Sequence, residues 1–372
     1  MQDQNPPKTK INWARSYDSI GNALGYSTHA KMLRAALERR PDVEIVEDGS
    51  APISVHIVTP DVYVPDYERF NVLYTMYEMA ELPPRWLEPL QYAETLVVPC
   101  THNKHLFSGY VKDIPIDVCN EGVEVDKFTY KERTKPKIGR FIFYWCGASN
   151  PRKGYHYAIA AWTAFNNRHP ELANDILLYM KTTQVSEDQE HIVGYDHGEP
   201  IKEKMPRERI FKQGNVFIDT RKIPFEGAGG LIEQYHGSHA FLFPTMGEGF
   251  GLTLAEAMAT GLPCIYTPWS GPNDFCSIKE AYPIKFGFTK VASARVMLDG
   301  SKIKAFESYA ADPDVYSIVR KMEQIYYHYD EAIERGKRAA ERIRREITWE
   351  ISAENFLQIV KRRFAEYEAK QK

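Results

Sequence analysis

The chain has 372 residues, of which 43% are hydrophobic and 26% charged, and its formal net charge is −3. This length suits two domains of ordinary size, and the composition is that of a globular protein rather than a disordered or fibrous one. The small net charge excludes a general attraction to nucleic acid, no apolar run approaches the roughly 20 residues that cross a bilayer, and the first residues lack the apolar segment of a signal peptide. We therefore expect a cytoplasmic protein without a nucleic-acid partner, and peripheral contact with a membrane stays open.

The first part of the chain alternates short apolar runs with helical segments. The expected strands lie at 8–14, 43–47, 53–59, 70–77, 95–99 and 115–119, and the expected helices at 26–40, 84–93 and 102–109. Strands that alternate with helices predict a parallel sheet covered on both faces. The segment 120–139 is charged and has no apolar period, so it is interpreted as a linker.

The second part repeats the alternation. Strands are expected at 140–147, 175–181, 209–218, 239–244 and 262–267, followed by a charged helical stretch over 313–345 and a last helix over 350–368. Asp312 and Pro313 suit the N-cap and first turn of the long stretch. The pattern predicts an α/β protein of two Rossmann-like domains facing each other across a cleft. In such sheets ligands bind beyond the carboxyl ends of the strands.

The five cysteines are odd in number and scattered, without a Cys-x-x-Cys pair; they are Cys100, Cys119, Cys146, Cys264 and Cys276. Several lie in apolar strands. Reduced, buried thiols are therefore expected rather than a redox or zinc site.

A glycine loop joins an expected strand to an expected helix in the segment AFLFPTMGEGFGLTLAEAMATGLPCI. Glycines allow the turn and a close approach of the backbone to a ligand, and the free N–H groups of the helix start, around Gly251 to Thr253, favour a phosphate. Thr253 and Glu256 share a helix face behind that phosphate position, where a ribose would lie, and Glu248 in the loop could reach a hexose. Thr253 and Glu256 also fit a capping box, in which Glu256 only bonds a backbone N–H, and this alternative stays open.

The whole pattern resembles a known family. Pro244, Glu248-Gly-Phe-Gly251, Glu256-Ala-Met-Ala259 and Gly261-x-Pro263 together resemble the E-x7-E motif of retaining glycosyltransferases of family 4, which have the two-domain GT-B fold. The resemblance implies that Glu248 contacts the donor sugar and that Glu256 binds the ribose. It further implies that Gly249, Phe250, Gly251, Leu252 and Thr253 form the loop and helix start that bind the diphosphate of the donor.

Arg152 and Lys153 follow the strand expected at 140–147, where cations could neutralise a leaving diphosphate. A solvated Arg-Lys turn is the alternative. The family has Gly-Arg after this strand and Lys-Gly a few residues later. Lys153-Gly154 matches the second element, whereas Ala148 follows Gly147 in place of the arginine. The resemblance therefore implies a phosphate-binding and catalytic role for Lys153, with Arg152 as the substitute for the missing arginine.

The first half resembles the family more loosely. Gly25, in Gly21-Asn-Ala-Leu-Gly25, is the counterpart of the family's glycine-rich turn near the donor phosphates. Gly122-Val-Glu124 resembles the crossing between domains, and Trp349 the start of the closing helix. The expected division is therefore 1–125 for an acceptor-binding domain, 126–138 for the linker, 139–345 for a donor domain and 346–372 for a helix returning to the first domain. His56 and His102 are candidates for the family's histidine near the donor sugar, although a structural role is favoured for each.

Other signals are weaker. His102/His105 and His236/His239 have a spacing that could bind zinc, but no Cys or acidic companion lies near in the sequence. Asp312-Pro-Asp314 matches the metal-binding Asp-x-Asp of the other large glycosyltransferase fold, but it opens an expected helix, so capping explains it better. The basic residues at 337–338 and 342–345 are interpreted as a solvated helix face.

The resemblance implies retaining transfer of a hexose from a UDP- or GDP-sugar to a glycan, glycolipid or other acceptor. The nucleotide-diphosphate sugar is a substrate, and neither a metal nor another cofactor is expected. Two alternatives remain. A non-catalytic GT-B partner could bind sugar nucleotide or glycan, and a nicotinamide dehydrogenase would use Gly247-x-Gly-x-Gly as its dinucleotide loop, although the spacing does not fit.

Overall fold

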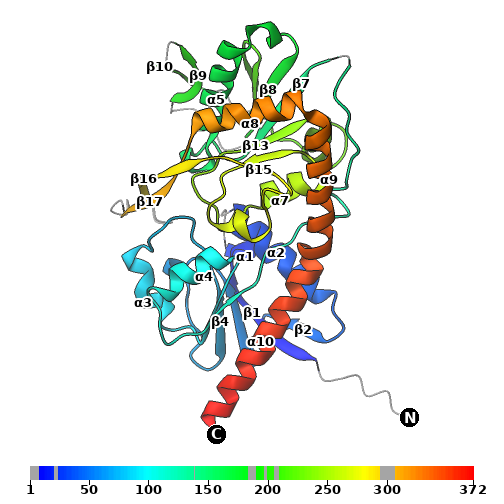
Figure 1. Ribbon diagram of the computed structural model, residues 1–372. Helices are drawn as coiled ribbons and strands as arrows, with labels where there is room; N and C mark the ends of the chain where they lie inside the picture. Colours follow the sequence, from blue (N-terminus) through cyan, green and yellow to red (C-terminus); the bar gives the residue numbers. More distant parts are fainter. Residues whose placement is uncertain are drawn as a thin grey trace, which may run out of the picture. The chain divides into compact units, whose positions relative to one another are not determined.

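The computed structural model describes residues 8–20, 24–137, 139–182, 190–196, 199–204, 209–293 and 306–372 (Figure 1). The chain divides into two compact units. Unit 1 comprises Met1–Gly122, Val291–Tyr309 and Glu346–Lys372, and unit 2 comprises Val123–Lys290 and Ala310–Arg345. Each unit contains its own parallel sheet and is described by itself.

Unit 1 has a six-stranded parallel sheet in the order β2-β1-β3-β4-β5-β6. Its strands are β1 (Thr9–Ser16), β2 (Val43–Val46), β3 (Ile53–Ile57), β4 (Phe70–Tyr74), β5 (Thr95–Val98) and β6 (Ile116–Val118). All six strands expected in the first half are confirmed within a few residues at their ends. Every residue of β3, β4 and β5 is buried, as expected for strands of a parallel sheet that is covered on both faces.

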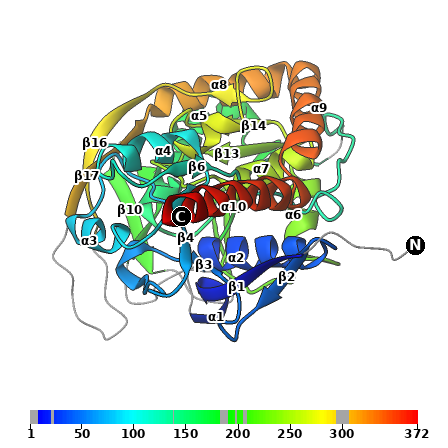
Figure 2. The ribbon, with the colours of Figure 1, turned by 90° about the horizontal axis from the view of Figure 1, so that it is seen from below.

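Helices cover this sheet. They are α1 (Tyr17–Ile20), α2 (Leu24–Glu38), α3 (Leu87–Leu90), α4 (Thr101–Ser108) and α10 (Trp349–Gln371), with short 3₁₀ turns η1 (Pro60–Val62) and η2 (Pro84–Trp86). The C-terminal helix α10 runs beside α2 (Figure 2). The Thr348 hydroxyl caps its first turn by accepting a hydrogen bond from the Ile351 N–H, and Phe356 stacks on Tyr74 of β4 at 6.1 Å between ring centroids. The expected helix over 350–368 is therefore confirmed and packs on the sheet of unit 1.

Unit 2 has a seven-stranded sheet in the order β11-β12-β8-β7-β13-β14-β15. Its strands are β7 (Phe141–Cys146), β8 (Ile176–Lys181), β11 (Ile210–Gln213), β12 (Val216–Asp219), β13 (Ala240–Phe243), β14 (Cys264–Tyr266) and β15 (Tyr282–Pro283). All of them run parallel except β11, which is antiparallel to β12. The single strand expected over 209–218 was wrong, because Gly214, at a φ of 57°, reverses the chain between β11 and β12.

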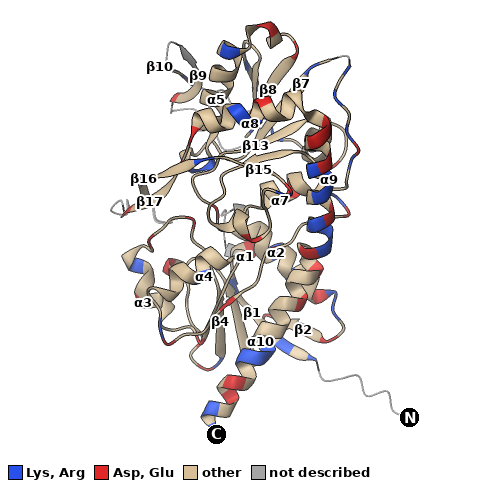
Figure 3. Cartoon of the chain, viewed as in Figure 1, with Lys and Arg blue, Asp and Glu red and all other residues tan. Residues whose placement is uncertain are grey.

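The helices of unit 2 are α5 (Tyr155–Arg168), α6 (Leu231–Gly237), α7 (Leu252–Ala259), α8 (Val315–Tyr327) and α9 (Tyr329–Glu346), with the 3₁₀ turns η3 (Pro151–Lys153), η4 (Pro170–Leu172) and η5 (Gly271–Asp274). Unit 2 also contains the strand pair β9 (Glu190–Asp196) with β10 (Glu199–Lys204), whereas the residues of the pair β16 (Phe286–Ser293) with β17 (Phe306–Pro313) are divided between the two units. Lys and Arg alternate with Asp and Glu along α9 (Figure 3). Two of these cations, Arg338 and Arg342, bond the Lys279 carbonyl and the Glu280 carboxylate, so this helix face is only partly solvated.

The expected start of the helix at Asp312 and Pro313 was wrong. Pro313 ends strand β17, and Asp314 is the N-cap of α8, where its side chain accepts a hydrogen bond from the Ser317 N–H. A residue before proline is disfavoured in the helical conformation, which keeps Asp312 extended. Asp312 instead accepts a hydrogen bond from the Tyr157 hydroxyl, so its carboxylate serves packing between β17 and α5.

The segment interpreted as a linker is held against unit 2 by Arg133, which is 7% exposed. Its guanidinium donates to the carbonyls of Tyr235, Ser238 and Thr260, at the C-terminal ends of helices α6 and α7. Burial lowers the pKa of Arg133 to about 10. One arginine therefore bonds carbonyl groups that two helix ends leave without intrahelical partners.

All five cysteines are free thiols, as expected. Burial raises the pKa of Cys119 to about 12, and its thiol donates to the Ser352 carbonyl at 3.4 Å. A buried thiol of this kind is unreactive, because the thiolate is the reactive form.

His56 has a structural role in unit 1. It is 2% exposed in strand β3, and its Nε2 lies 3.2 Å from the Asn71 side-chain oxygen. Burial lowers the pKa of His56 to about 4 from its ordinary 6.5. The imidazole is therefore neutral in the folded protein near neutral pH.

The lowered pKa of His56 predicts a loss of stability in acid. At a pH between the unfolded pKa of about 6.5 and the folded pKa of about 4, the unfolded chain binds a proton that the folded chain does not bind. The contribution of neutral His56 to the unfolding free energy is therefore intact above about pH 6.5 and is lost as the pH falls toward about 4. We expect His56→Gln, which keeps a polar partner for Asn71, to reduce the loss of unfolding free energy between about pH 7.5 and about pH 5 by roughly 2 kcal/mol. Urea unfolding at the two pH values measures the difference, and an unchanged pH dependence would contradict the role given to His56.

Candidate active site

The glycine loop connects strand β13 to helix α7 at the carboxyl edge of the sheet of unit 2. Residues 241–250 are all buried, and Gly251 takes a φ of 115° as the N-cap of α7, a conformation that favours glycine. The N–H groups of Leu254 and Ala255 bond the Gly251 carbonyl. The N–H groups before them, including those of Leu252 and Thr253, have no acceptor within the helix and carry the positive end of its dipole.

The capping-box interpretation of Thr253 and Glu256 is wrong. Gly251 is the N-cap and Thr253 is already the second residue of the helix. The Glu256 carboxylate instead accepts a hydrogen bond from the Tyr235 hydroxyl at 3.2 Å. Tyr235 is fully buried, and burial raises its pKa well above the ordinary range, so the hydroxyl remains a donor. Tyr235 therefore fixes the side chain of Glu256 on the same helix face as Thr253.

The loop is braced by a segment that the sequence analysis did not single out, Ser270 and Gly271. The Glu248 N–H donates to the Ser270 hydroxyl at 2.9 Å, and the Gly271 N–H donates to the Glu248 carbonyl at 3.2 Å. A Cβ at Gly271 would overlap the backbone of Phe250, and Ser270 has a φ of 61°. The only signal in the sequence is the Ser-Gly-Pro turn that follows the strand at 264–266.

Arg152 and Lys153 form a 3₁₀ turn between β7 and α5. Asn150 caps this turn, because its side-chain oxygen accepts the Arg152 N–H at 2.9 Å. Gly154 follows with a φ of 72°, and a Cβ there would overlap the Pro244 carbonyl at the end of β13. The turn is thereby packed directly against the start of the glycine loop.

The structure brings three of the predicted site residues into one ionic cluster. The Lys153 Nζ lies 2.9 and 2.8 Å from the two carboxylate oxygens of Glu248, and an Arg152 Nη lies 3.3 Å from one of them. Arg152 also donates to the Gly247 carbonyl at 2.6 Å. The Glu248 side chain is only 6% exposed, against 23% for Lys153 and 21% for Arg152. The alternative of a solvated Arg-Lys turn is therefore wrong for both cations.

The remaining predicted residues are more dispersed. Gly249 and Phe250 are buried in the loop, and Phe250 packs on Phe275 at 4.7 Å between ring centroids. Gly25 lies in the first turn of α2 in unit 1, while residues 21–23 of its predicted turn lie outside the described residues. His102 lies in α4 of the same unit.

The two histidine pairs, for which no zinc site was expected, belong to no group of three or more His, Cys, Asp or Glu side chains arranged to hold an ion among the described residues. His236 Nε2 lies 2.8 Å from the Thr129 carbonyl oxygen, and His239 Nδ1 accepts the Ile142 N–H. The two side chains of this pair are thus used by separate backbone groups.

The fit of Gly154 against Pro244 gives a prediction. In Gly154→Ala the added Cβ must push the turn away from the glycine loop, which separates Lys153 and Arg152 from Glu248. We expect the variant to have both a lower melting temperature and a lower rate of glycosyl transfer than the wild type. Gly237→Ala is the matched control, because that glycine lies in α6 with nothing within 4 Å of the added Cβ. Equal melting temperatures and transfer rates in the two variants would contradict the role given to the contact between Gly154 and Pro244.

Two units with parallel sheets, one of which carries this loop and cation turn, define the GT-B class of fold. The comparisons with solved structures support this class. A glycosyltransferase from Rickettsia africae is 12% identical with a TM-score of 0.61, covering 96% of this chain and 99% of its own. A sucrose-phosphate synthase from Thermosynechococcus elongatus is 14% identical with a TM-score of 0.57, covering 93% and 80%.

The family comparison concerns unit 2. Residues 140–281 match the model of the family described as glycosyl transferases group 1, so the expected likeness to a GT-B glycosyltransferase is confirmed for the part of the chain that carries the candidate site. A curated relative from Escherichia coli, a UDP-Gal:alpha-D-GlcNAc-diphosphoundecaprenol alpha-1,3-galactosyltransferase, is 25% identical over 232 residues, covering 56% of this chain and 51% of its own. The chain thus spans about half the length of the curated relative that it matches.

Proposed function

We propose that the protein is a retaining glycosyltransferase that moves a hexose from a UDP- or GDP-sugar to a glycan or lipid-linked acceptor. The observation that carries the proposal is the cluster of Lys153, Arg152 and Glu248 at the start of the glycine loop. A domain of the glycosyl transferases group 1 family holds this cluster, and the N-terminus of α7 lies a few residues further along the loop.

The charges of the cluster suit the charges that develop during glycosyl transfer. When a sugar nucleotide reacts, negative charge grows on the leaving diphosphate and positive charge on the anomeric carbon. Two cations and a helix N-terminus suit the first, and the Glu248 carboxylate suits the second. Glu256, held by Tyr235, would bind the ribose hydroxyls, since a carboxylate accepts two hydrogen bonds readily. Because protein groups supply the positive charge, the proposal includes metal-independent transfer, and activity should persist in EDTA.

The proposed donor and acceptor are taken from the curated relative, whose name specifies UDP-galactose and a sugar linked to diphosphoundecaprenol. UDP-galactose is therefore the first donor to test. A lipid-linked acceptor would bring the protein to a membrane surface as a peripheral protein. No helix among the described residues is both long and apolar enough to span a bilayer.

A calorimetric titration with UDP, GDP and NAD⁺ separates the three candidate classes. We expect one of the two nucleoside diphosphates to bind, with weaker binding in Lys153→Met, and NAD⁺ to give no signal. Preference for NAD⁺ would favour the dehydrogenase. Tight binding of UDP or GDP with no turnover of any donor would favour a non-catalytic GT-B partner.

A further inference from the structure

A cavity of about 460 Å³ lies in unit 2 at the other edge of its sheet. Arg140, Asn174 and Asn215 line it, and these residues lie within two positions before the first residues of strands β7, β8 and β12. Lys153 and Glu248, by contrast, follow strands β7 and β13. Because these strands are parallel, the cavity and the candidate active site occupy opposite edges of the sheet. The cavity is therefore not part of the candidate active site.

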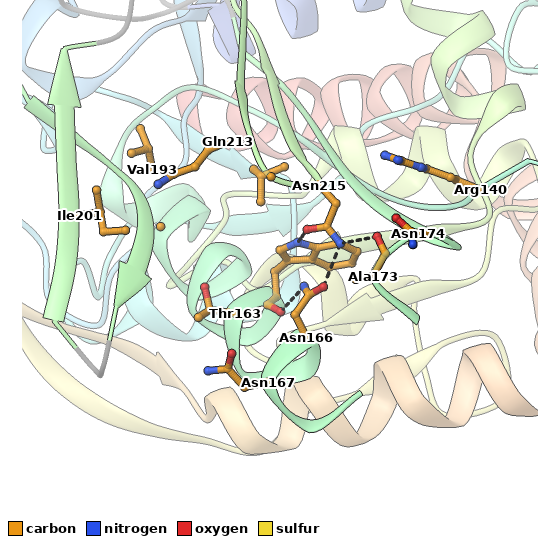
Figure 4. A pocket seen from close by; sticks show the side chains of 14 residues that line it. Arg140, Thr163, Asn166, Asn167, Ala173, Asn174, Val193, Ile201, Gln213 and Asn215 are labelled. Carbon is orange, nitrogen blue, oxygen red and sulfur yellow. Dashed lines mark hydrogen bonds between the residues drawn. The ribbon is translucent and has the colours of Figure 1, made fainter. Parts of the chain in front are cut away.

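Neutral polar side chains and apolar groups share the wall of the cavity (Figure 4). Five of its lining residues carry side-chain amides: Asn166, Asn167, Asn174, Gln213 and Asn215. Thr163 adds a hydroxyl, Val193 and Ile201 add an apolar patch, and Arg140 is the one charged residue that the described part of the chain places in the lining. An amide can both donate and accept a hydrogen bond, which matches the hydroxyl groups of a sugar.

Part of this wall is fixed in advance. The Asn215 amide nitrogen donates to the Asn166 side-chain oxygen at 2.8 Å and to the Ala173 carbonyl at 3.3 Å. The Asn215 oxygen accepts the Trp162 indole N–H at 3.0 Å. Figure 4 shows the bonds from Asn215 to Asn166 and Ala173. A wall held by its own hydrogen bonds loses little conformational freedom when a ligand binds.

Gln213 supplies the unsatisfied group. Its side-chain oxygen is buried, and no hydrogen-bond donor contacts it in the part of the chain that the structure describes. The same oxygen lies 3.1 Å from the position of an added Cβ at Gly194, so a larger residue in place of that glycine would crowd it. A buried acceptor without a donor is costly, and a rotation of the Gln213 side chain toward a ligand hydroxyl would relieve the cost.

We propose that this cavity binds a neutral pyranose unit, as a second carbohydrate site remote from the candidate active site. Its volume falls within the range of about 300–1,000 Å³ usual for small-molecule sites. Among the described residues the lining has a single cation and no carboxylate, which suits an uncharged polyhydroxyl ligand better than a phosphate or a metal. A sugar of a polymeric glycan held here would keep that glycan attached between encounters with the active site. Binding at this cavity does not require the proposed transferase activity.

Two tryptophans report on the two sites separately. The Trp162 indole N–H is bonded to Asn215 in the cavity, and the Trp145 indole N–H is bonded to the Lys153 carbonyl at 3.1 Å. In protein labelled with ¹⁵N-indole tryptophan, Trp162→Phe and Trp145→Phe assign the two signals. Methyl glucoside, methyl galactoside and methyl N-acetylglucosaminide, together with a neutral oligosaccharide, are then titrated.

We expect at least one neutral glycoside to move the Trp162 signal saturably while the Trp145 signal stays in place. Gln213→Leu and the exposed Asn174→Ala should each weaken this binding by about tenfold, whereas Gln358→Leu on α10 should not. A tighter response to the oligosaccharide than to the single glycosides would identify a glycan chain as the source.

A Trp162 signal that no glycoside moves would overturn the proposal, as would a response to inorganic phosphate alone or one that survives both cavity substitutions. UDP and GDP are titrated separately, and one of them should move only the Trp145 signal. Failure of both nucleotides in that titration would count against the proposed function and leave the carbohydrate site unaffected.

Discussion

Replacement of Lys153 by Met is expected to lower kcat for glycosyl transfer by about 10²–10³-fold, the usual effect of removing one group that stabilises developing charge. The substitution keeps most of the side-chain volume and removes the ammonium that bonds both oxygens of Glu248. Glu248→Gln should reduce kcat to a similar degree, because the amide keeps the shape and loses the charge. Initial rates of nucleotide release with a saturating acceptor measure both effects.

The two substitutions act on one cluster, so their effects should not add. The double variant is expected to be little slower than either single variant, because each already breaks the same ion pair. Lys137→Ala is the matched control, since Lys137 is exposed in the same unit. Thermal unfolding of each variant separates lost chemistry from lost stability. Single variants with near wild-type kcat would remove Lys153 and Glu248 from the catalytic machinery.

Replacement of Arg133 by Met is expected to lower the unfolding free energy of unit 2 by about 3–5 kcal/mol. The guanidinium bonds three carbonyls at the ends of α6 and α7 and also the Thr260 hydroxyl. Without it, buried acceptors remain unsatisfied, at a cost of about 1–3 kcal/mol each before any relaxation. Urea unfolding followed by tryptophan fluorescence measures the change.

Arg133→Lys tests the geometry of the same contact. It keeps a cation but cannot reproduce the planar fork of donors, so an intermediate loss of stability is expected. Arg320→Met, at an exposed position of α8, is the matched control and should change the unfolding free energy by less than about 0.5 kcal/mol. A loss for Arg133→Met no greater than the control would mean that the segment is held by other contacts.

Most strands of the two sheets could be predicted from the sequence, because a parallel strand that is buried on both faces appears as a short run of mostly apolar residues. The runs at β3, β4 and β5 are mostly apolar, and every residue in them is buried. The β9–β10 hairpin was missed for the opposite reason: β10 is Glu-Pro-Ile-Lys-Glu-Lys, an exposed and mostly charged strand without an apolar run. The reversal at Gly214 was missed because β11 and β12 read as one continuous run.

The candidate site was predictable in its residues but not in its contacts. The spacing of Glu248 and Glu256 placed both on one loop and helix. Lys153 and Arg152 reach Glu248 because Gly154 packs closely on Pro244. This contact joins residues far apart in the chain, so no short sequence pattern indicates it. Tyr235 and Ser270 were missed for the same reason, since each acts through a contact with a distant part of unit 2. The buried role of Arg133 was hidden because a charged residue in a charged segment is normally solvated.

Product analysis with UDP-galactose and a lipid-diphosphate-linked N-acetylglucosamine tests the proposed retaining, metal-independent transfer. We expect acceptor-dependent release of UDP by the wild type, in EDTA as well as without it. NMR of the product should show an α-linked galactose, the configuration of the donor. The Lys153→Met protein should form this product only at the reduced rate given above. A β-linked product would contradict retention, and transfer by Lys153→Met at the wild-type rate would contradict the role of the Lys153–Glu248 cluster.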